Sequence, residues 1–342
     1  MKNTKKIIPG FGAALIIAIA AKWLESLLPI HLIGASVIAL FIGMLINHFR
    51  KPGDIMMPGL KFTSKKVLKF AIILLGASLS IGTILEVGKF SLMVMIFTLL
   101  TCFGGGYFIG KALGLNWKLS NLISAGTGIC GGSAITAIAP AIDAKDNDIA
   151  YAMSATFLFD MAMIVLFPIL GRAMGLSDMA YGLWAGTAVN DTSSVVAAGY
   201  AFSETAGDFA TMVKLTRTLS IIPTVIIFAL VELNIKKKEA LTLGTTSNEK
   251  AQINFYTLFP WFILGFIALA IINSLGFIPA TISASAKELS KLLMVCALAA
   301  IGLNTSFHDM KKSGIAPMLH GFIISALVVI VAIAVEYFIG IV

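Results

Sequence analysis

The chain of 342 residues is 58% hydrophobic and only 12% charged, whereas soluble domains average about 45–50% and about 25%. This composition excludes an ordinary soluble enzyme and indicates an all-α integral membrane protein. The net charge of +8 does not by itself indicate a nucleic-acid partner, because lysines and arginines in the loops set the orientation of a membrane protein. Because the longest polar connection, residues 235–254, is too short for a soluble domain, residues 1–342 are treated as one polytopic transmembrane domain.

Apolar segments recur along the whole chain, and each can cross a hydrocarbon core of about 30 Å. We predict eleven transmembrane helices, near residues 7–24, 31–48, 67–85, 89–110, 119–141, 149–171, 180–203, 209–232, 256–274, 287–304 and 314–340. The first has a second interpretation, because Lys5, Lys6, an apolar run and Ala18-Ile19-Ala20 resemble a cleavable signal peptide. A retained helix is simpler, since the next apolar segment follows closely.

Lysine and arginine positions predict the orientation, with a cytoplasmic amino terminus and an outer carboxyl terminus. On this assignment eighteen of the 25 basic residues are cytoplasmic: Lys2, Lys5, Lys6, Arg50, Lys51, Lys61, Lys65, Lys66, Lys69, Lys111, Lys118, Arg172, Lys236, Lys237, Lys238, Lys250, Lys311 and Lys312. Five are outside: Lys22, Lys89, Lys145, Lys287 and Lys291. The chain is therefore expected in a cell membrane, which it crosses several times.

The segment 119–141 contains the string GTGICGGS from Gly126 to Ser133. Each glycine costs a helix about 1 kcal/mol relative to alanine, so a continuous helix is disfavoured. We expect two half-helices, one ending near Gly128 and one beginning near Ser133, which would cap it. Unpaired backbone at membrane depth needs surrounding protein or a wet cavity, so Gly131, Gly132 and Ser133 are predicted to bind substrate. Close helix packing is the alternative role for these glycines.

The segment 180–203 contains a second interruption, GTAVNDTSSVVAAG from Gly186. Asp191, Thr192 and Ser193 are all good caps, so this helix is also predicted to break, near Asn190 and Asp191. Free N–H groups at a half-helix start suit an anion, which makes Asn190, Thr192 and Ser193 candidate substrate ligands. The side chains of Asn190 and Asp191 also suit a coupling cation.

Three more charged residues lie within predicted helices. Asp160 is surrounded by apolar residues in FLFDMAMIV and is a candidate for ion coupling. Lys214 and Arg217 are three positions apart and share one helical face, where they are candidates for anion binding. The alternatives are a structural ion pair with Asp160 or Asp191, and a Lys214 side chain that reaches the membrane interface. The scattered histidines and cysteines predict no metal site, disulfide or other cofactor.

An internal echo links the two interrupted segments at an offset of sixty residues. Gly126 aligns with Gly186, Thr127 with Thr187 and Ser133 with Ser193. A second, weaker echo pairs LLGASLS at residues 74–80 with AIGLNTS at residues 300–306. Such echoes predict inverted repeats, as in secondary transporters. The two members of the first pair are separated by one predicted span, so they would run in the same direction. They would run in opposite directions if one of them turns back within the membrane, and the residues leave both possibilities open.

The strings GTGICGGSAITAIAP, GTAVNDTSSVVAAG and VKLTR resemble the YeiH-type bacterial inner-membrane proteins, a family named for sulfate export. That family is grouped with cation/proton antiporters and bile-acid symporters. The resemblance implies a panel domain, a core domain and broken helices that cross at the substrate site. It also implies a bacterial inner membrane as the location and sulfate or an organic sulfonate as substrate. Eleven spans depart from a five-plus-five repeat, which leaves the pairing of the repeats open.

The leading hypothesis is a secondary transporter, not an enzyme, that exports a small anion by alternating access with Na⁺ or H⁺ as coupling ion. The anion ligands would be Gly131, Gly132, Ser133, Asn190, Thr192, Ser193, Lys214 and Arg217, and the coupling residues Asp160, Asn190 and Asp191. The alternatives are a cation/proton antiporter and a membrane protein that transports nothing. The expected partners are the lipid bilayer and the anion, and a homodimer is left open.

Overall fold

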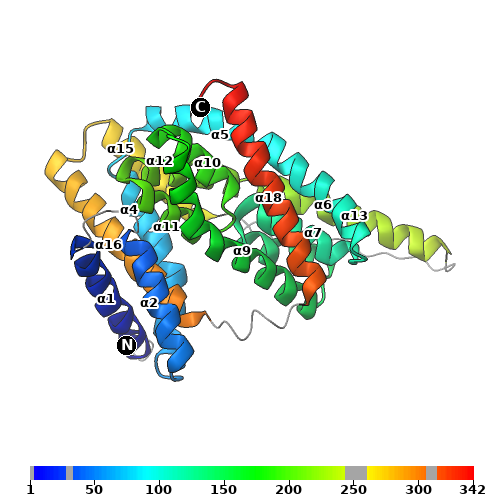
Figure 1. Cartoon of the computed structure of the whole chain (residues 1–342), viewed down its shortest axis with the longest axis horizontal. Helices are drawn as coiled ribbons and strands as arrows, with labels where there is room; N and C mark the ends of the chain where they lie inside the picture. Colours follow the sequence, from blue (N-terminus) through cyan, green and yellow to red (C-terminus); the bar gives the residue numbers. More distant parts are fainter. Residues whose placement is uncertain (1–3, 28–33, 243–259, 306–313) are drawn as a thin grey trace.

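The computed structural model describes residues 4–27, 34–242, 260–305 and 314–342, and its regular structure there is entirely helical (Figure 1). The helices form two bundles, a smaller one on the left of Figure 1 and a larger one that extends from its centre to its right. The all-α prediction is therefore confirmed. The predicted helices that start at residues 31 and 256, and most of the loop 235–254, extend into residues outside the described ranges.

The smaller bundle, called the panel bundle here, combines segments from both ends of the chain. Its members are α1 (Thr4–Leu27), α2 (Ala35–Phe49), α3 (Met57–Phe62), the π-turn η1 (Thr63–Val67), α4 (Leu68–Gly76), α15 (Trp261–Ser274) and α16 (Ala280–Asn304). Small residues hold it together. A Cβ at Gly43 would lie 2.6 Å from the Ala299 carbonyl oxygen, and one at Gly302 would lie 2.1 Å from that of Leu40. Helices in lipid gain affinity from such close backbone approach.

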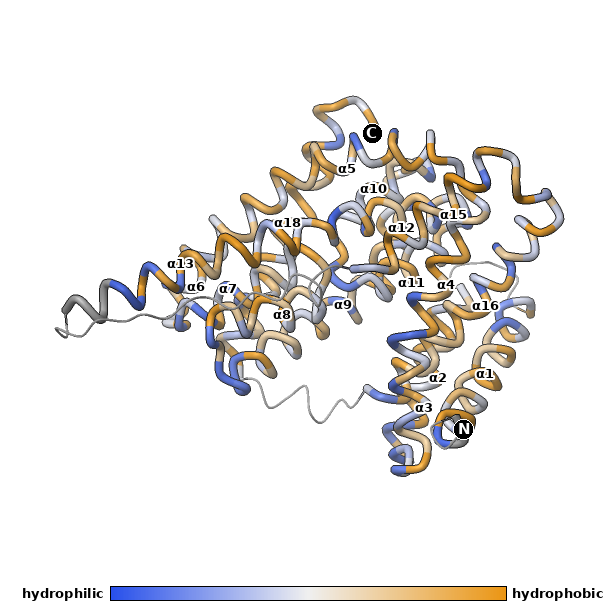
Figure 2. The backbone as a smooth tube through the Cα atoms, turned by 180° about the vertical axis from the view of Figure 1, so that it is seen from behind, coloured by the Kyte–Doolittle hydropathy of each residue, from blue (hydrophilic) through white to orange (hydrophobic). Residues whose placement is uncertain are grey.

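The larger bundle, called the core bundle, contains both interrupted segments. Its members are α5 (Ile81–Leu100), η2 (Thr101–Gly105), α6 (Gly106–Ala112), α7 (Trp117–Ala125), η3 (Gly126–Cys130), α8 (Gly132–Ile138), η4 (Ala139–Ile142), α9 (Asp146–Ala173), α10 (Asp178–Ala188), α11 (Thr192–Phe202), α12 (Glu204–Thr218), α13 (Ile221–Thr242) and α18 (Ile315–Phe338). Apolar residues dominate these helices and hydrophilic ones gather toward their ends, as Figure 2 shows.

Within the described residues, five helical runs are long and apolar enough to cross a membrane. They are Lys6–Leu27, Ile81–Ala112, Asp146–Ala173, Glu204–Lys237 and Ile315–Phe338. Shorter apolar helices cover Ala35–Phe49, Gly132–Ile142 and Trp261–Ser274. Most boundaries agree with the sequence prediction to within a few residues. The predicted helix 67–85 differs most, because the chain is already helical from Met57 and turns near Ser80, whose side chain caps α5.

The segment from α7 to η4 does not cross the membrane but turns back, and we call it the first hairpin. Lys118, near its start, donates a hydrogen bond of 3.2 Å to the carbonyl of Asp143, just after its end. Asn116 and Asp148 are joined in the same way at 3.2 Å. Lys236 at the end of α13 also reaches Asp143, at 2.5 Å, and its ammonium lowers the pKa of that carboxyl. The predicted crossing at 119–141 is therefore wrong.

The second interrupted segment, α10 with α11, turns back as well and is called the second hairpin. Ser203, after its end, donates to the Asp178 carboxylate at its start over 2.6 Å. Inside the hairpin, Tyr181 donates to the Ala198 carbonyl at 2.9 Å and stacks on Phe202. The Arg172 guanidinium at the end of α9 donates to the Ala201 carbonyl at 2.8 Å. The predicted crossing at 180–203 is therefore also wrong.

The two hairpins open toward opposite faces, because the 28 residues of α9 connect them and span about 42 Å. We call these the Lys118 face, with Asp143 and Lys236, and the Arg172 face, with Asp178. The loop with Lys145 therefore lies on the side predicted for the loop with Arg172, and the loop with Arg172 lies on the side predicted for the loop with Lys145. Each carries one of the basic residues counted above, so the predicted totals of eighteen and five are unchanged.

This topology makes a labelling prediction. In a background with Cys102, Cys130 and Cys296 replaced by serine, cysteines introduced by Lys111→Cys and Lys145→Cys should react with a membrane-impermeant maleimide from the same side of oriented vesicles. Met174→Cys should react from the other side, because α9 separates the two loops. Labelling of Lys145→Cys and Lys111→Cys from opposite sides would restore a crossing at 119–141.

Candidate functional site

The tips of the two hairpins touch each other in the middle of the core bundle. A Cβ built on Gly131 would lie 2.9 Å from the Asp191 Cβ and 3.1 Å from its Cα. Gly131 also has φ 63° and ψ −135°, a conformation that side chains essentially exclude. Gly131 and Asp191 are sixty residues apart, the offset of the sequence echo. Corresponding points of the two echoes therefore meet in space.

Both predicted helix breaks exist, with small shifts in position. The first half-helix ends at Cys130 rather than near Gly128, and the second begins at Gly132. Gly131 occupies the cap position, so the prediction that Ser133 caps α8 is wrong. In the second hairpin the break covers Val189 to Asp191, as expected. The Asp191 carboxylate caps α11 by accepting from the Ser193 amide at 2.9 Å and from the Ser193 hydroxyl.

Asp160 ties the middle of α9 to the second break. One of its carboxylate oxygens accepts the Asn190 amide at 2.9 Å and the other accepts the Asp191 amide at 3.1 Å. Two carboxylates, Asp160 and Asp191, are thus placed at the amino-terminal end of α11, where the helix dipole favours negative charge. This arrangement explains why a carboxylate persists in a span of otherwise apolar residues.

Lys214 and Arg217 hold the opposite ends of the two breaks. The Lys214 ammonium donates to the Val189 carbonyl at 2.8 Å, at the carboxyl end of α10. The Arg217 guanidinium donates to the Gly128 carbonyl through Nε and to the Thr127 carbonyl at 3.1 Å. Both side chains are fully buried. One face of α12 therefore supplies positive charge to the carboxyl ends of both first half-helices, the sign that the dipole requires there.

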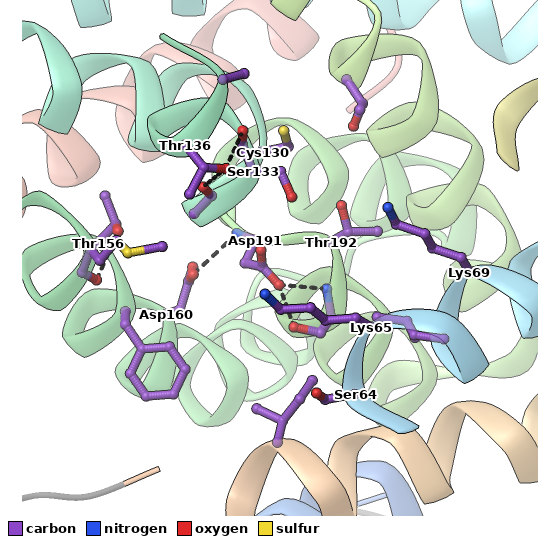
Figure 3. A pocket seen from close by; sticks show the side chains of 18 of the residues that line it. Ser64, Lys65, Lys69, Cys130, Ser133, Thr136, Thr156, Asp160, Asp191 and Thr192 are labelled. Carbon is purple, nitrogen blue, oxygen red and sulfur yellow. Dashed lines mark hydrogen bonds between the residues drawn. The ribbon is translucent and has the colours of Figure 1, made fainter. Parts of the chain in front are cut away.

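A cavity of about 810 Å³ lies between the two bundles and contains both hairpin tips in its lining (Figure 3). On the core side it follows Thr136 and Pro140 down the first hairpin and Met153 to Asp160 along α9. Pro140 lies near the Lys118 face and Asp160 lies halfway along α9, so the cavity reaches from that face to mid-depth. On the panel side it is lined by residues of η1, α4, α15 and α16.

Of the ten candidate residues, six lie in the lining of this cavity and four lie outside it. Gly132, Ser133, Thr192, Ser193, Asp160 and Asp191 line the cavity. Gly131, Asn190, Lys214 and Arg217 pack behind it, and none of the four is exposed. Backbone carbonyls accept from Lys214 and from Nε and Nη2 of Arg217, whereas the buried Arg217 Nη1 has no partner within the described residues. The direct contact of these two side chains with an anion stays a prediction.

Two lysines in the lining were missed as site residues. Lys65 and Lys69 are one helical turn apart, so they face the same way, and Figure 3 shows Lys65 extending toward Asp191. Lys69 also lies over the Phe262 ring, 5.4 Å from its centroid. From the sequence, both lysines were counted only among the cytoplasmic basic residues that orient the protein, because the helix was predicted to start at residue 67. Their i, i+4 spacing was the signal that could have identified them.

Comparison with known proteins gives the family. The family model described as Conserved hypothetical protein 698 matches residues 9–321. A UPF0324 membrane protein of Clostridium tetani is 54% identical over 339 residues, 98% of each chain. Another, of Streptococcus pyogenes serotype M3, is 39% identical over 345 residues, 100% of each chain. The chain belongs to the Conserved hypothetical protein 698 family.

Members of this family are multi-pass membrane proteins of bacteria, in agreement with the helical bundles described above. Among solved structures, the sodium proton antiporter MjNhaP1 from Methanocaldococcus jannaschii aligns over 96% of this chain and 98% of its own. The identity is 14% and the TM-score is 0.30.

The contact between the tips predicts a difference between two neighbouring glycines. Gly131→Ala should lower the free energy of unfolding by about 1–3 kcal/mol, because the new Cβ would have to occupy both a forbidden conformation and the space of Asp191. Gly132→Ala is the matched control, since its Cβ would meet only the flexible end of Met153, at 3.3 Å. Thermal unfolding of the purified variants measures both, and equal stabilities would contradict the tip contact.

Proposed function

We propose that the protein is a secondary transporter that exports a small anion, such as sulfate or an organic sulfonate, by alternating access. The observation that carries the proposal is the tip-to-tip meeting of two hairpins from opposite faces at the deep end of a cavity between two bundles. Discontinuous helices at mid-depth are the usual way in which membrane proteins offer backbone dipoles to a solute. The resemblance to YeiH-type proteins supplies the substrate class.

The cavity supports an anion as cargo. Lys65 and Lys69 bring two ammonium groups from the panel bundle, and Ser133, Thr136 and Thr192 bring hydroxyl groups from the core bundle. An oxyanion between the bundles would thus contact both, and its presence would affect how they close on each other. Small oxyanions are bound in proteins by this combination of charge and hydroxyl donors. No chemical step on the anion is required, so no enzymatic activity is proposed.

Ion pairs between the two bundles, on the side of the molecule opposite the cavity, are consistent with alternating access. At the Arg172 face, Lys287 of α16 pairs with Asp208 of α12 at 2.8 Å, and Lys291 pairs with Glu204 at 2.6 Å. Tyr200 donates to the same Asp208 carboxylate at 2.6 Å. These ion pairs connect the panel bundle to the core bundle beyond the hairpin tips. They would hold that side closed while the cavity is open to the Lys118 face.

A cation/proton antiporter is the second candidate. Two carboxylates, Asp160 and Asp191, lie in the cavity lining, and such groups bind and release protons or cations in many membrane transporters. The two candidates differ in what Lys65 and Lys69 do. In an anion transporter these lysines bind the cargo, whereas in an antiporter they only compensate charge. A protein without transport activity would move neither species.

Flux in proteoliposomes tests the proposal. We expect the wild-type protein to move labelled sulfate or taurine, and Lys65→Gln with Lys69→Gln to raise the half-saturating anion concentration at least about tenfold, because hydrogen bonds to charged groups contribute about 1.5–3 kcal/mol. Lys66→Gln is the control, since Lys66 is exposed but is not part of the cavity lining. Sodium-driven proton movement without anion movement would instead support the antiporter, and no flux at all would reject transport.

The ion pairs at the Arg172 face give a further test. Replacing Lys287 and Lys291 by glutamine should weaken the closed side, so that a cysteine introduced by Thr136→Cys, in the Cys102, Cys130 and Cys296 serine background, reacts faster with an impermeant maleimide added at the Arg172 face. Lys89→Gln on α5 is the control, because that lysine is not part of these pairs. An unchanged labelling rate would show that the pairs do not close that side.

A further inference from the structure

The cavity between the bundles is lined by charges of both signs. Lys65 and Lys69 come from the panel bundle. Asp160 and Asp191 come from the core bundle. Figure 3 shows Lys65 extending toward Asp191, yet within the described residues neither lysine forms an ion pair with either aspartate. Opposite charges therefore face the same cavity without direct contact between them.

The Asp191 carboxylate has one oxygen atom that the protein leaves available. Its Oδ2 accepts from the amide and the hydroxyl of Ser193, whereas Oδ1 accepts from no donor in the described part of the chain. Asp191 is half-buried and lines the cavity, so water can solvate this oxygen when the cavity is empty. The core side of the cavity thus presents a charged acceptor as well as hydroxyl groups.

Two buried basic residues behind the tips belong to the same charge balance. Lys214 and Arg217 donate to backbone carbonyls at the two helix breaks. Neither lines the cavity, and neither forms an ion pair with Asp160 or Asp191 within the described residues. Their positive charge offsets that of the two carboxylates, so the cavity can still accept an anionic group. They supply no hydrogen-bond donor to the Asp191 Oδ1.

A solute that fills the cavity has to replace the water around both kinds of charge. Displacing ordered water costs affinity when the solute cannot reproduce the hydrogen bonds of that water. Inorganic sulfate has only acceptor oxygens at neutral pH, so it suits the lysines but places negative charge beside Asp191. An ammonium group has three donors and a positive charge, and it therefore suits a carboxylate with a free acceptor.

We propose that this cavity binds a small zwitterion, whose anionic group contacts the two lysines and whose ammonium group contacts Asp191. Short aminosulfonates and amino acids with separated charged groups have this chemistry, whereas inorganic sulfate does not. The inference rests on the proposed function and narrows its substrate class. Because the lysines belong to the panel bundle and Asp191 to the core bundle, one zwitterion would be held by both bundles through opposite charges.

Asp160 is a positioning residue in this arrangement. Its two carboxylate oxygens accept the backbone amides of Asn190 and Asp191, at 2.9 and 3.1 Å, and so fix the chain from which the Asp191 side chain enters the cavity. It also adds negative charge on the side where the ammonium group is bound. The ammonium site is therefore built from the second break, whereas the anionic group is bound from across the cavity.

Thermal unfolding of the purified full-length protein tests the proposal with matched ligands. Isethionate has the carbon chain and sulfonate of taurine, with a hydroxyl in place of the ammonium group. We expect taurine to give half-maximal stabilisation at a concentration at least about tenfold lower than isethionate or sulfate, because hydrogen bonds between charged groups are the stronger ones. Stabilisation by β-alanine at the concentration found for taurine would extend the class to carboxylates, and weaker stabilisation would restrict it to aminosulfonates.

A single substitution tests where the ammonium group binds. Asp191→Asn removes the charge and keeps a side chain that can cap α11, so it should abolish the preference for taurine over isethionate. Asp146→Asn is the matched control, because Asp146 is exposed at the start of α9 and is not part of the cavity lining. The preference should persist in that variant.

Several outcomes would overturn the inference. Equal concentrations for taurine and isethionate in the wild-type protein would reject a zwitterion, whether or not Asp191→Asn folds. A preference that persists in Asp191→Asn would reject Asp191 as the ammonium ligand, and stabilisation by ethylammonium chloride at the concentration found for taurine would indicate a site for a simple cation. Flux of sulfate and isethionate without a preference for taurine would reject the inference and leave the proposed function standing. Selective stabilisation by taurine without flux of any solute would do the reverse.

Discussion

The structure depends on one requirement of the hydrocarbon core, that no backbone N–H or C=O group be left unpaired there. Two helix breaks at mid-depth expose such groups at four ends. Asp160 and Asp191 accept N–H groups at the amino-terminal end of α11, while Lys214 and Arg217 donate to carbonyls at the carboxyl end of α10 and in η3. Three buried charged residues, Asp160, Lys214 and Arg217, and the half-buried Asp191 thus form hydrogen bonds with the backbone.

These backbone contacts change which basic residues are available to bind an anion. A buried arginine in a membrane helix invites the interpretation that it binds an anion, but Nε and Nη2 of Arg217 donate to the carbonyls of Gly128 and Thr127. Removing Arg217 would leave two carbonyls without donors, so loss of flux in such a variant would not identify a ligand. Lys65 and Lys69 do not have this difficulty, because they belong to the panel bundle and face the cavity. They can approach or leave the hairpin tips if the two bundles move as units.

The sequence predicted the all-α fold and both breaks, because glycine clusters and capping residues act locally and are visible in the chain. It did not predict that both interrupted segments turn back. Counting basic residues on each side could not detect this. Two hairpins separated by one span leave the direction of every later helix unchanged. Only the loops with Lys145 and Arg172 change sides, and each carries one counted basic residue. The reversal depends on contacts between distant residues, such as Lys118 with Asp143. The carbonyl contacts of Arg217 could not be predicted for the same reason, because its partners lie about ninety positions away.

The echo at sixty residues acquires a physical meaning once both members are hairpins. One full span between them forces the two to open to opposite faces, so the copies are inverted and their tips can meet head to head. The copies differ where they touch: Gly131 and Cys130 in the first correspond to Asp191 and Asn190 in the second. A small residue on one side makes room for a carboxylate on the other, since any Cβ at Gly131 would collide with Asp191. The pairing therefore places the carboxylate of the tip contact on the second hairpin, while the first hairpin contributes the hydroxyl groups of Ser133 and Thr136 to the cavity lining.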